Sequence, residues 1–325
     1  MVSLPDGNPN NSAERIPELM KNRVITDVFE PGSTIKPIVM AAALDAGVIT
    51  EKTVFPTRGN YYIGRNVVRD TKNYGTLDSI GVIRKSSNVG MAMISQRLPR
   101  EKYQSFMQSI GFGRLSGIEF PGEQRGIMHN PKNLGDFAYA TTSFGYGISV
   151  TALQLVHAYA ALANDGVQVP LTLLKRQKAE AGRRIMSEQT ALSVRKMLKE
   201  AVSNQGTGRR SNTENYTVAG KTGTSHKIID GRYAKNRYRS VFAGYAPADN
   251  PKIAVVVVVD DPKRGGYYGG VVAAPSFAKI TEWSLKMLGV LPDKIGQSGH
   301  IELDIDQEVF ASEANELEAI PDAPI

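Results

Sequence analysis

Three short strings of residues have the types and the order of an acyl-transfer site. They are Ser33-Thr34-Ile35-Lys36, then Ser86-Ser87-Asn88, then Lys221-Thr222-Gly223-Thr224. A single S-x-x-K string is weak evidence, because it is expected by chance about once in a chain of this length. K-T-G is expected in about one chain in ten or fewer, and it occurs once here, as does S-x-N. The ordered combination therefore predicts a nucleophile, a proton carrier and a substrate-binding strand.

The first string supplies the candidate nucleophile and base. Ser33 follows Pro31-Gly32 at a predicted loop-to-helix junction, where backbone N–H groups and the helix dipole stabilise developing negative charge. Lys36 lies one turn later on the same face. Lowering its pKa from about 10.4 to about 7 would require roughly 4 to 5 kcal/mol of destabilisation of its charge. Burial and a second cation, with Lys221 as the candidate, could supply this. The alternative is that Ser33 is an N-cap and Lys36 a solvated first-turn residue.

Two further S-x-x-K strings compete with the first, at residues 193–196 and 276–279. Ser193 and Lys196 are predicted in the middle of a helix, where a serine has no free backbone N–H groups around it. Ser276 and Lys279 belong to the predicted C-terminal helix. We therefore expect solvated helix surface for the first pair and a helix start for the second.

The third string continues an apolar run from Tyr216 and is predicted on the first strand of a sheet. Glycine is costly inside a strand, so Gly223 indicates that another group approaches the backbone closely. A substrate could pair along this edge, with Lys221 and the hydroxyls of Thr222 and Thr224 facing its carboxylate. The N–H groups of Thr224 and the serine nucleophile could form an oxyanion hole. The alternative is a strand that leaves the sheet through a glycine turn.

Ser86 and Asn88 by themselves would be a loop or a helix cap. Beside the other strings, Ser86 would pass a proton between Lys36 or Lys221 and a leaving amine, and Asn88 would hold a substrate amide. This chemistry requires no histidine. A Ser-His-Asp site is disfavoured because no serine has the G-x-S-x-G context, and His226 is expected to be an exposed loop residue.

The composition limits the other classes of function. The chain has 325 residues, 41% hydrophobic content, a net charge of +7 and a pI near 9.4. Its basic residues are scattered among acids, so nucleic-acid binding is not predicted, and an anionic substrate or surface is an equally natural partner. The chain has four histidines, no cysteine and no H-E-x-x-H string. We therefore predict neither a bound metal nor a cofactor. The absence of cysteine leaves the redox compartment open.

The chain divides into two parts. Residues 1–295 are expected to form the catalytic domain, and the start at Met1–Pro5, which resembles the end of a strand, suggests a domain excised from a longer chain. The sequence contains no run of about eighteen apolar residues, so neither a membrane span nor a signal peptide is predicted in it. Residues 296–325 are expected to be an acidic, disordered tail. Its acidic residues are Glu302, Asp304, Asp306, Glu308, Glu313, Glu316, Glu318 and Asp322.

Apolar periodicity predicts an α+β fold. Helical spacing occurs at residues 33–47, 151–163, 187–202 and 275–288. Apolar or alternating runs at 216–220, 239–246 and 252–260 are separated by turn residues and are therefore most simply antiparallel strands. We expect an antiparallel sheet with helices packed on it and a mostly helical subdomain.

The three motifs resemble those of the penicilloyl-serine transferases, with Ser-Ser-Asn in place of S-D-N. The wider context resembles the transpeptidase domain of class B penicillin-binding proteins, most of all the cell-division enzyme of Gram-negative bacteria. The similarity runs from about Asn22 to Leu291 and implies the α/β sandwich of that family. The matching strings are Val28–Pro37, Lys85–Gly90, Ser143-Phe144-Gly145-Tyr146-Gly147, Ala219–Thr224 and Tyr267-Tyr268-Gly269-Gly270.

The resemblance implies a D,D-transpeptidase that cross-links peptidoglycan in the periplasm without a cofactor. Ser33 would attack the penultimate D-alanine of a stem peptide, release the terminal D-alanine and pass the acyl group to a neighbouring amine. β-Lactams, which resemble D-Ala-D-Ala, would acylate Ser33 too. Tyr267 and Tyr268 would border the cleft, although ordinary loop packing is the alternative.

The resemblance also implies a location and partners. The full-length protein would be anchored to the inner membrane by an N-terminal helix. It would bind divisome membrane proteins and a glycosyltransferase, whereas this fragment is expected to be monomeric.

Three neighbouring activities share the same motifs. A β-lactamase needs a group that activates the deacylating water, such as the glutamate of an E-x-x-L-N string, which this sequence lacks. A β-lactam sensor domain would acylate without turnover, and a D,D-carboxypeptidase would transfer the acyl group to water.

Overall fold

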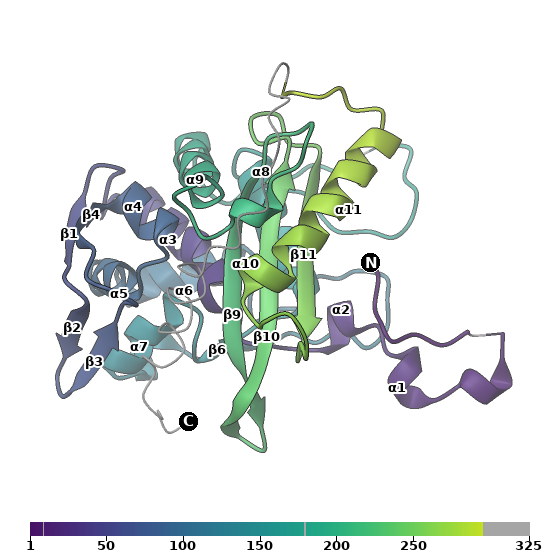
Figure 1. The fold of residues 1–325 in the computed structure, drawn as a ribbon, viewed down its shortest axis with the longest axis horizontal. Coiled ribbons are helices and arrows are strands. Elements are labelled where there is room, and N and C mark those ends of the chain that lie inside the picture. The colour runs from purple at the N-terminus through teal and green to yellow at the C-terminus, as the bar shows by residue number, and fades with distance from the viewer. Residues whose placement is uncertain (9, 179, 295–325) are drawn as a thin grey trace.

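A three-stranded antiparallel sheet lies at the centre of the computed structural model, which describes residues 1–8, 10–178 and 180–294 (Figure 1). Its strands are ordered β11-β10-β9. The acidic tail predicted at 296–325 lies outside the described residues. The strand bounds are β9 (Ala219–Ile229), β10 (Arg232–Ala246) and β11 (Ile253–Asp260).

Helices cover both faces of this sheet, as the alternation of its side chains requires. Val241 and its neighbours at alternate positions join the larger core on the side of α8 (Ala152–Ala163). Phe242 points to the other face, where its ring lies 4.5 Å from that of Phe277 on α11 (Ala274–Met287). The short α10 (Gly269–Val272) precedes α11 on the same side of the sheet (Figure 1). The layers confirm the predicted α+β class.

A mostly helical region lies beside the β9 edge of the sheet (Figure 1). There α9 (Glu188–Ala201) packs against β9 and against two helices of the region, α3 and α4. The other bounds are α3 (Lys36–Asp45), α4 (Ser79–Arg84), α5 (Asn88–Arg97), α6 (Arg100–Ser109) and α7 (Asp136–Thr142), with the pairs β1 (Val54–Thr57) and β4 (Gly75–Asp78), and β2 (Asn60–Ile63) and β3 (Asn66–Arg69).

The remaining elements are short. They are η1 (Ser12–Glu14), α1 (Pro17–Met20), α2 (Arg23–Thr26), η2 (Gly32–Ile35), β5 (Ile127–Met128), η3 (Pro131–Asn133), β6 (Ile148–Ser149), β7 (Val167–Gln168), β8 (Arg183–Arg184) and η4 (Arg209–Ser211). The segment that contains α1 extends away from the sheet, whereas α2 lies beside β11 and packs against α8 (Figure 1). The end of a strand expected at Met1–Pro5 is wrong, because these residues pair with no strand in the described structure.

Three predicted elements have different bounds. The strand expected over 239–246 begins already at Arg232. The helix expected over 33–47 is divided into η2 and α3, because Pro37 has no N–H and the N–H of Lys36 closes a tighter turn onto the carbonyl of Ser33. The strand expected over 216–220 begins at Ala219 and runs to Ile229. It ends only at Asp230-Gly231, whose φ angles of 52° and 74° suit a tight hairpin turn.

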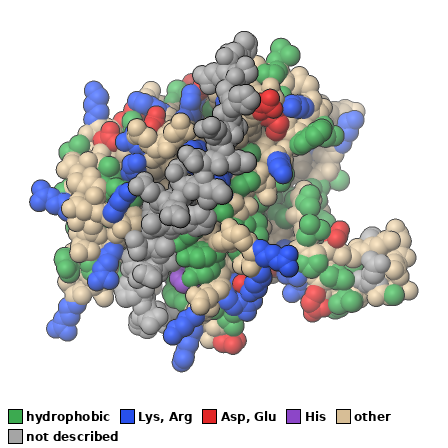
Figure 2. Space-filling view, viewed as in Figure 1, with side chains coloured by type: hydrophobic (Ala, Val, Ile, Leu, Met, Phe, Trp, Pro, Cys, Tyr) green, Lys and Arg blue, Asp and Glu red, His purple; other side chains and the backbone are tan. Residues whose placement is uncertain are grey.

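No helix in the described ranges combines the length and the apolar character that crossing a membrane requires. Lys and Arg side chains stand at many separate places on the visible face (Figure 2).

We predict that Gln154 contributes strongly to stability. Its side-chain amide is 3% exposed and donates to the backbone carbonyls of Gly111, Arg114 and Arg125. Gln154→Leu should lower the free energy of unfolding by about 2 to 4 kcal/mol, because three backbone carbonyls lose their side-chain donor. Urea unfolding measures this change. The exposed Gln96 makes one bond of 3.5 Å, so Gln96→Leu should change stability by less than about 0.5 kcal/mol; equal effects would contradict the prediction.

Candidate active site

Ser33 lies in the short 3-10 helix η2, and its side chain is 6% exposed. The preceding Gly32 has φ +51°, a conformation that favours glycine. The hydroxyl of Thr34 donates to the carbonyl of Pro31 at 2.7 Å, and Tyr159 on α8 donates to the carbonyl of Thr34 at 2.8 Å. The turn that carries Ser33 is therefore held by the hydroxyl of Thr34 and by Tyr159 of the buried helix α8.

Ser33, Ser86 and Lys36 form a chain of hydrogen bonds. The ammonium of Lys36 donates to the carbonyl of Ser86 at 2.5 Å and to its hydroxyl at 3.0 Å. The hydroxyl of Ser86 in turn donates to Ser33 Oγ at 3.0 Å. Lys36 is fully buried, so the alternative of a solvated first-turn lysine is wrong. Ser33 is not an N-cap either, since Pro31 caps η2.

Ser86 occupies an unusual backbone conformation between α4 and α5. Its φ is +56°, in the left-handed region that non-glycine residues seldom adopt. In this conformation its carbonyl and its hydroxyl both accept from Lys36. Such local strain is concentrated at functional sites, where the surrounding structure holds it in place.

A buried carboxylate that we did not predict, Asp70, anchors the S-S-N string. Asp70 accepts hydrogen bonds from the hydroxyl of Ser87 at 2.5 Å and from the backbone N–H groups of Asn88 and Val89 at 2.6 and 3.0 Å. Burial raises the pKa of Asp70 to about 6, while its hydrogen bonds and the charge of Lys36 act in the opposite direction. Asp70 follows β3, and no local pattern indicated that this hairpin reaches α5.

Asn88 begins α5 and is 4% exposed. Its side-chain amide donates to the carbonyl of Arg69 at 3.5 Å. This contact places the amide beside the Ser86 loop, but it is long, so the amide remains able to take a stronger partner.

The K-T-G string lies on β9, as predicted, at one edge of the described sheet. Lys221 is fully buried, and its ammonium donates to the carbonyl of Thr222 at 3.3 Å and to the hydroxyls of Thr222 and Thr207 at 3.3 and 3.4 Å. The two threonine hydroxyls are 2.8 Å apart. Thr207 is a further residue that the sequence did not single out, since it lies in a loop that carries no motif.

The close approach expected at Gly223 is present. A Cβ at this position would lie 2.8 Å from the carbonyl oxygen of Pro31 and 2.8 Å from the methyl carbon of Thr34. The strand β9 therefore packs its backbone directly onto the turn that carries Ser33. The alternative of a strand that leaves the sheet at this glycine is wrong, because β9 continues beyond it.

The Tyr267-Tyr268 loop lies beside the same strand. The N–H of Gly269 donates to the hydroxyl of Thr224 at 3.0 Å, which joins the loop to β9. Tyr267 stacks on Tyr238 with ring centroids 4.0 Å apart. Tyr268 is 2% exposed and its hydroxyl lies 2.7 Å from that of Tyr267. The packing alternative is therefore favoured for Tyr268, whereas Tyr267 is half-buried.

His226 is not an exposed loop residue, so that prediction is wrong. It lies on β9 because the strand is longer than expected, and it is half-buried. Its ring centroid lies 4.8 Å from that of Tyr238 and 6.2 Å from that of Tyr233.

The competing S-x-x-K strings lie on α9 and α11. Ser193 is 6% exposed and donates to Glu51 at 2.7 Å, and Lys196 donates to the same carboxylate at 3.0 Å. The solvated surface expected for Ser193 is therefore wrong, since the Glu51 loop covers it. Ser276 is exposed in the first turn of α11, as predicted.

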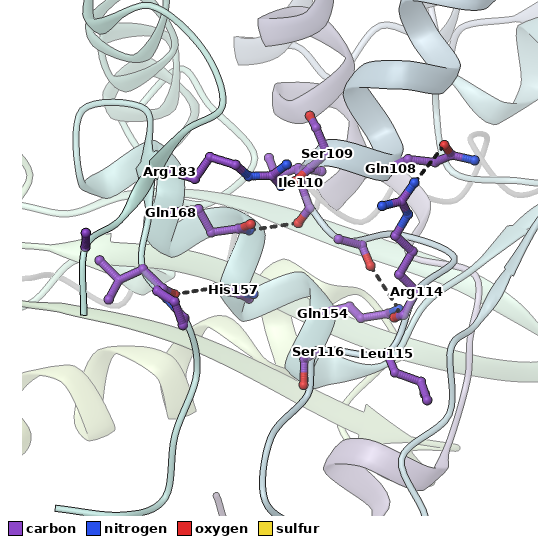
Figure 3. A pocket seen from close by; sticks show the side chains of 14 residues that line it. Gln108, Ser109, Ile110, Arg114, Leu115, Ser116, Gln154, His157, Gln168 and Arg183 are labelled. Carbon is purple, nitrogen blue, oxygen red and sulfur yellow. Dashed lines mark hydrogen bonds between the residues drawn. The ribbon is translucent and has the colours of Figure 1, made fainter. Parts of the chain in front are cut away.

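A cavity of about 270 Å³ elsewhere in the molecule contains none of these candidate residues. Figure 3 shows Gln154, His157 and Gln168 along its wall, with polar side chains that bond to backbone carbonyls. Burial lowers the pKa of His157. Within the described ranges no cluster of acidic and histidine residues could hold a metal ion.

The chain is similar to known proteins in sequence and in fold. A family model of the penicillin binding protein transpeptidase domain matches residues 1–282. The chain belongs to this transpeptidase family. The probable peptidoglycan D,D-transpeptidase PenA of Neisseria gonorrhoeae is 43% identical over 297 residues, which are 90% of this chain and 50% of that protein. Peptidoglycan D,D-transpeptidase FtsI of Escherichia coli is 38% identical over 308 residues, covering 94% and 52%.

A solved structure extends the similarity to three dimensions. The apo transpeptidase domain of Burkholderia pseudomallei penicillin-binding protein 3 matches with a TM-score of 0.81 and 40% identity, over 84% of this chain and 83% of that one. Thus the fold is that of a penicillin-binding protein transpeptidase domain. The chain spans about half the length of the curated relatives it matches.

We predict that Asp70 makes stability depend on pH. Because its ordinary pKa of 3.8 is raised to about 6, the folded state keeps a proton that the unfolded chain releases between these values. The free energy of unfolding should therefore fall by up to about 3 kcal/mol as the pH rises through this window. Asp70→Asn should remove this part of the fall, which urea unfolding of both chains at several pH values measures. Parallel curves for the two proteins would contradict the prediction.

Proposed function

We propose that this domain is a serine-type peptidoglycan D,D-transpeptidase with Ser33 as its nucleophile. The observation that carries the proposal is the hydrogen-bonded series from buried Lys36 through Ser86 to Ser33 Oγ, beside the edge strand β9. A hydroxyl joined to an amine by a second hydroxyl can be deprotonated as it attacks a carbonyl. The names of the relatives support the same reaction.

The proposed acylation moves one proton around these atoms. Lys36 must first lose one proton from its ammonium. Ser33 Oγ then bonds to the carbonyl carbon of the penultimate D-alanine, and the hydroxyl proton of Ser33 passes through Ser86 to the amine of Lys36, since hydroxyl hydrogens can rotate. Collapse of the tetrahedral intermediate breaks the C–N bond, and the proton returns to the leaving D-alanine. An amine of a second stem peptide then attacks the ester carbonyl. The ester C–O bond breaks, and the proton that the amine loses passes back to Ser33 Oγ, which restores its hydroxyl.

The substrate would lie along β9. Its backbone would extend the sheet at that edge, and its terminal carboxylate would face Lys221, Thr222 and Thr224. Asn88 would hold an amide of the stem peptide. The backbone N–H groups of Ser33 and Thr224 would form the oxyanion hole. The closeness of the two segments supports this, because a Cβ on Gly32 would lie 2.9 Å from the carbonyl oxygen of Thr224.

We place this domain in a longer protein that acts on the periplasmic side of the inner membrane. Residues 1–295 would be its transpeptidase domain and 296–325 its acidic tail. The similarity to FtsI of Escherichia coli supports a role in cell division, and we propose divisome membrane proteins and a glycosyltransferase as the partners of the longer protein.

Intact-mass spectrometry with benzylpenicillin tests the nucleophile. We expect one adduct on the parent chain that is stable over hours and is absent in Ser33→Ala, because the variant has no hydroxyl to form the ester. Ser193→Ala is the matched control and should acylate like the parent.

Other results would point to other activities. Rapid loss of the adduct would indicate a β-lactamase. No adduct on the parent, or an adduct on Ser33→Ala, would contradict the proposal. Release of D-alanine from a pentapeptide without cross-linking would indicate a carboxypeptidase, and acylation without any peptide turnover by the full-length protein would indicate a sensor.

A further inference from the structure

Glu30 is a buried carboxyl three residues before the nucleophile, and the proposed mechanism does not use it. Its side chain is 5% exposed, and one oxygen, Oε1, accepts from the N–H of Gly147 at 2.8 Å and from the hydroxyl of Tyr233 at 3.1 Å. The other oxygen, Oε2, is buried without a hydrogen-bond partner. Burial of a carboxyl costs free energy that hydrogen bonds to one of its two oxygens offset only in part.

These contacts join three segments that are distant in the chain. Glu30 belongs to the turn that carries Ser33, Gly147 to the loop of residues 143–147, and Tyr233 to β10. The same turn receives a hydrogen bond from Ser225 on β9, whose hydroxyl donates to the carbonyl of Glu30 at 2.8 Å. The carboxyl and the carbonyl of Glu30 therefore connect the nucleophile turn both to the 143–147 loop and to the sheet.

The loop of residues 143–147 touches the nucleophile turn at a second point. The N–H of Gly32 donates to the carbonyl of Gly145 at 3.3 Å, and a Cβ on Gly145 would lie 2.2 Å from the carbonyl oxygen of Gly32. Gly145 has φ +95°, which only glycine adopts without strain. The 143–147 loop and the nucleophile turn are thus in backbone contact. The hydrogen bond from Gly147 to the Glu30 side chain is a second connection between the same two segments.

We propose that Glu30 is a positioning residue for acylation. Its carboxyl holds the 143–147 loop and β10 against the turn that carries Ser33, and so keeps Ser33 Oγ within hydrogen-bonding distance of the Ser86 hydroxyl. This inference rests on the proposed function, because it assumes that Ser33 reacts. Glu30 itself touches no reacting atom. A displacement of the turn by a fraction of an ångström would lengthen the Ser33–Ser86 bond of 3.0 Å, and proton transfer depends steeply on that distance.

The chemistry of Glu30 suggests a discriminating variant. Burial raises the pKa of Glu30 to about 7, whereas its bonds to Gly147 and Tyr233 lower it. A neutral amide can accept the same two hydrogen bonds through its carbonyl oxygen. Glu30→Gln should therefore keep the link, while Glu30→Ala removes it and leaves the N–H of Gly147 without this acceptor.

Stopped-flow acylation by a chromogenic β-lactam separates positioning from simple stability. For Glu30→Ala we expect the acylation rate constant to fall about tenfold or more, with the dissociation constant of the noncovalent complex within about twofold of the parent. Glu30→Gln should stay within about threefold of the parent rate. All rates are normalised to the fraction of chains that finally acquire an adduct.

Leu285→Ala is the matched control for lost stability. Leu285 is fully buried in the separate core cluster around α11. This variant should lower the melting temperature without changing the normalised acylation rate. An equal loss of rate in Leu285→Ala would overturn the proposal, as would a Glu30→Ala rate like the parent's, or a Glu30→Gln rate as slow as that of Glu30→Ala.

Hydrogen–deuterium exchange tests the link without any acylation. Backbone amides of residues 143–147 should exchange faster in Glu30→Ala than in the parent and in Glu30→Gln, and unchanged exchange would overturn the proposal. A parent that forms no adduct but shows this exchange difference would contradict the proposed function of Ser33 while leaving the structural link in place.

Discussion

Backbone contact between β9 and the turn of Ser33 is the constraint on which the site depends. Gly223 allows the strand to lie against Pro31 and Thr34, where any Cβ would collide. On the opposite side, a Cβ on Gly269 would lie 2.3 Å from the carbonyl oxygen of Gly223. The turn, the strand and the start of α10 are therefore stacked with almost no side chain between them. A stack of this kind has little freedom, so it places the serine relative to the edge strand within narrow limits.

The second feature of the site is that its charged groups are buried among neutral partners. Lys36 and Lys221 are fully buried, and their described donations go to hydroxyls and carbonyls. Asp70 and Glu30 accept from N–H and hydroxyl groups, and burial raises the pKa of both carboxyls. Burial of this kind destabilises the fold but leaves dipoles oriented before a substrate arrives, which is how preorganised sites stabilise developing charge.

The site lies where the two parts of the molecule meet. Lys36 and Ser86 come from the helical region, whereas Lys221 and Thr224 come from the sheet. The described edge of β9 faces that region (Figure 1), so an extended peptide along the strand would pass both sets of groups. The helix α9 packs both on β9 and on α3, and so connects the sheet to the helical region beside the site.

The sequence by itself determined the three motifs, their order, the α+β class and the helices α8, α9 and α11, because these depend on residue type and on spacing within a few turns. Only the tertiary structure decided that Asp70 supports Ser87 and Asn88, that Thr207 joins Lys221, and that Glu30 reaches Gly147. The partners in the last pair are 117 positions apart in the chain. Local periodicity reports which face of an element is apolar, but hydrogen bonds between distant loops depend on how whole elements pack.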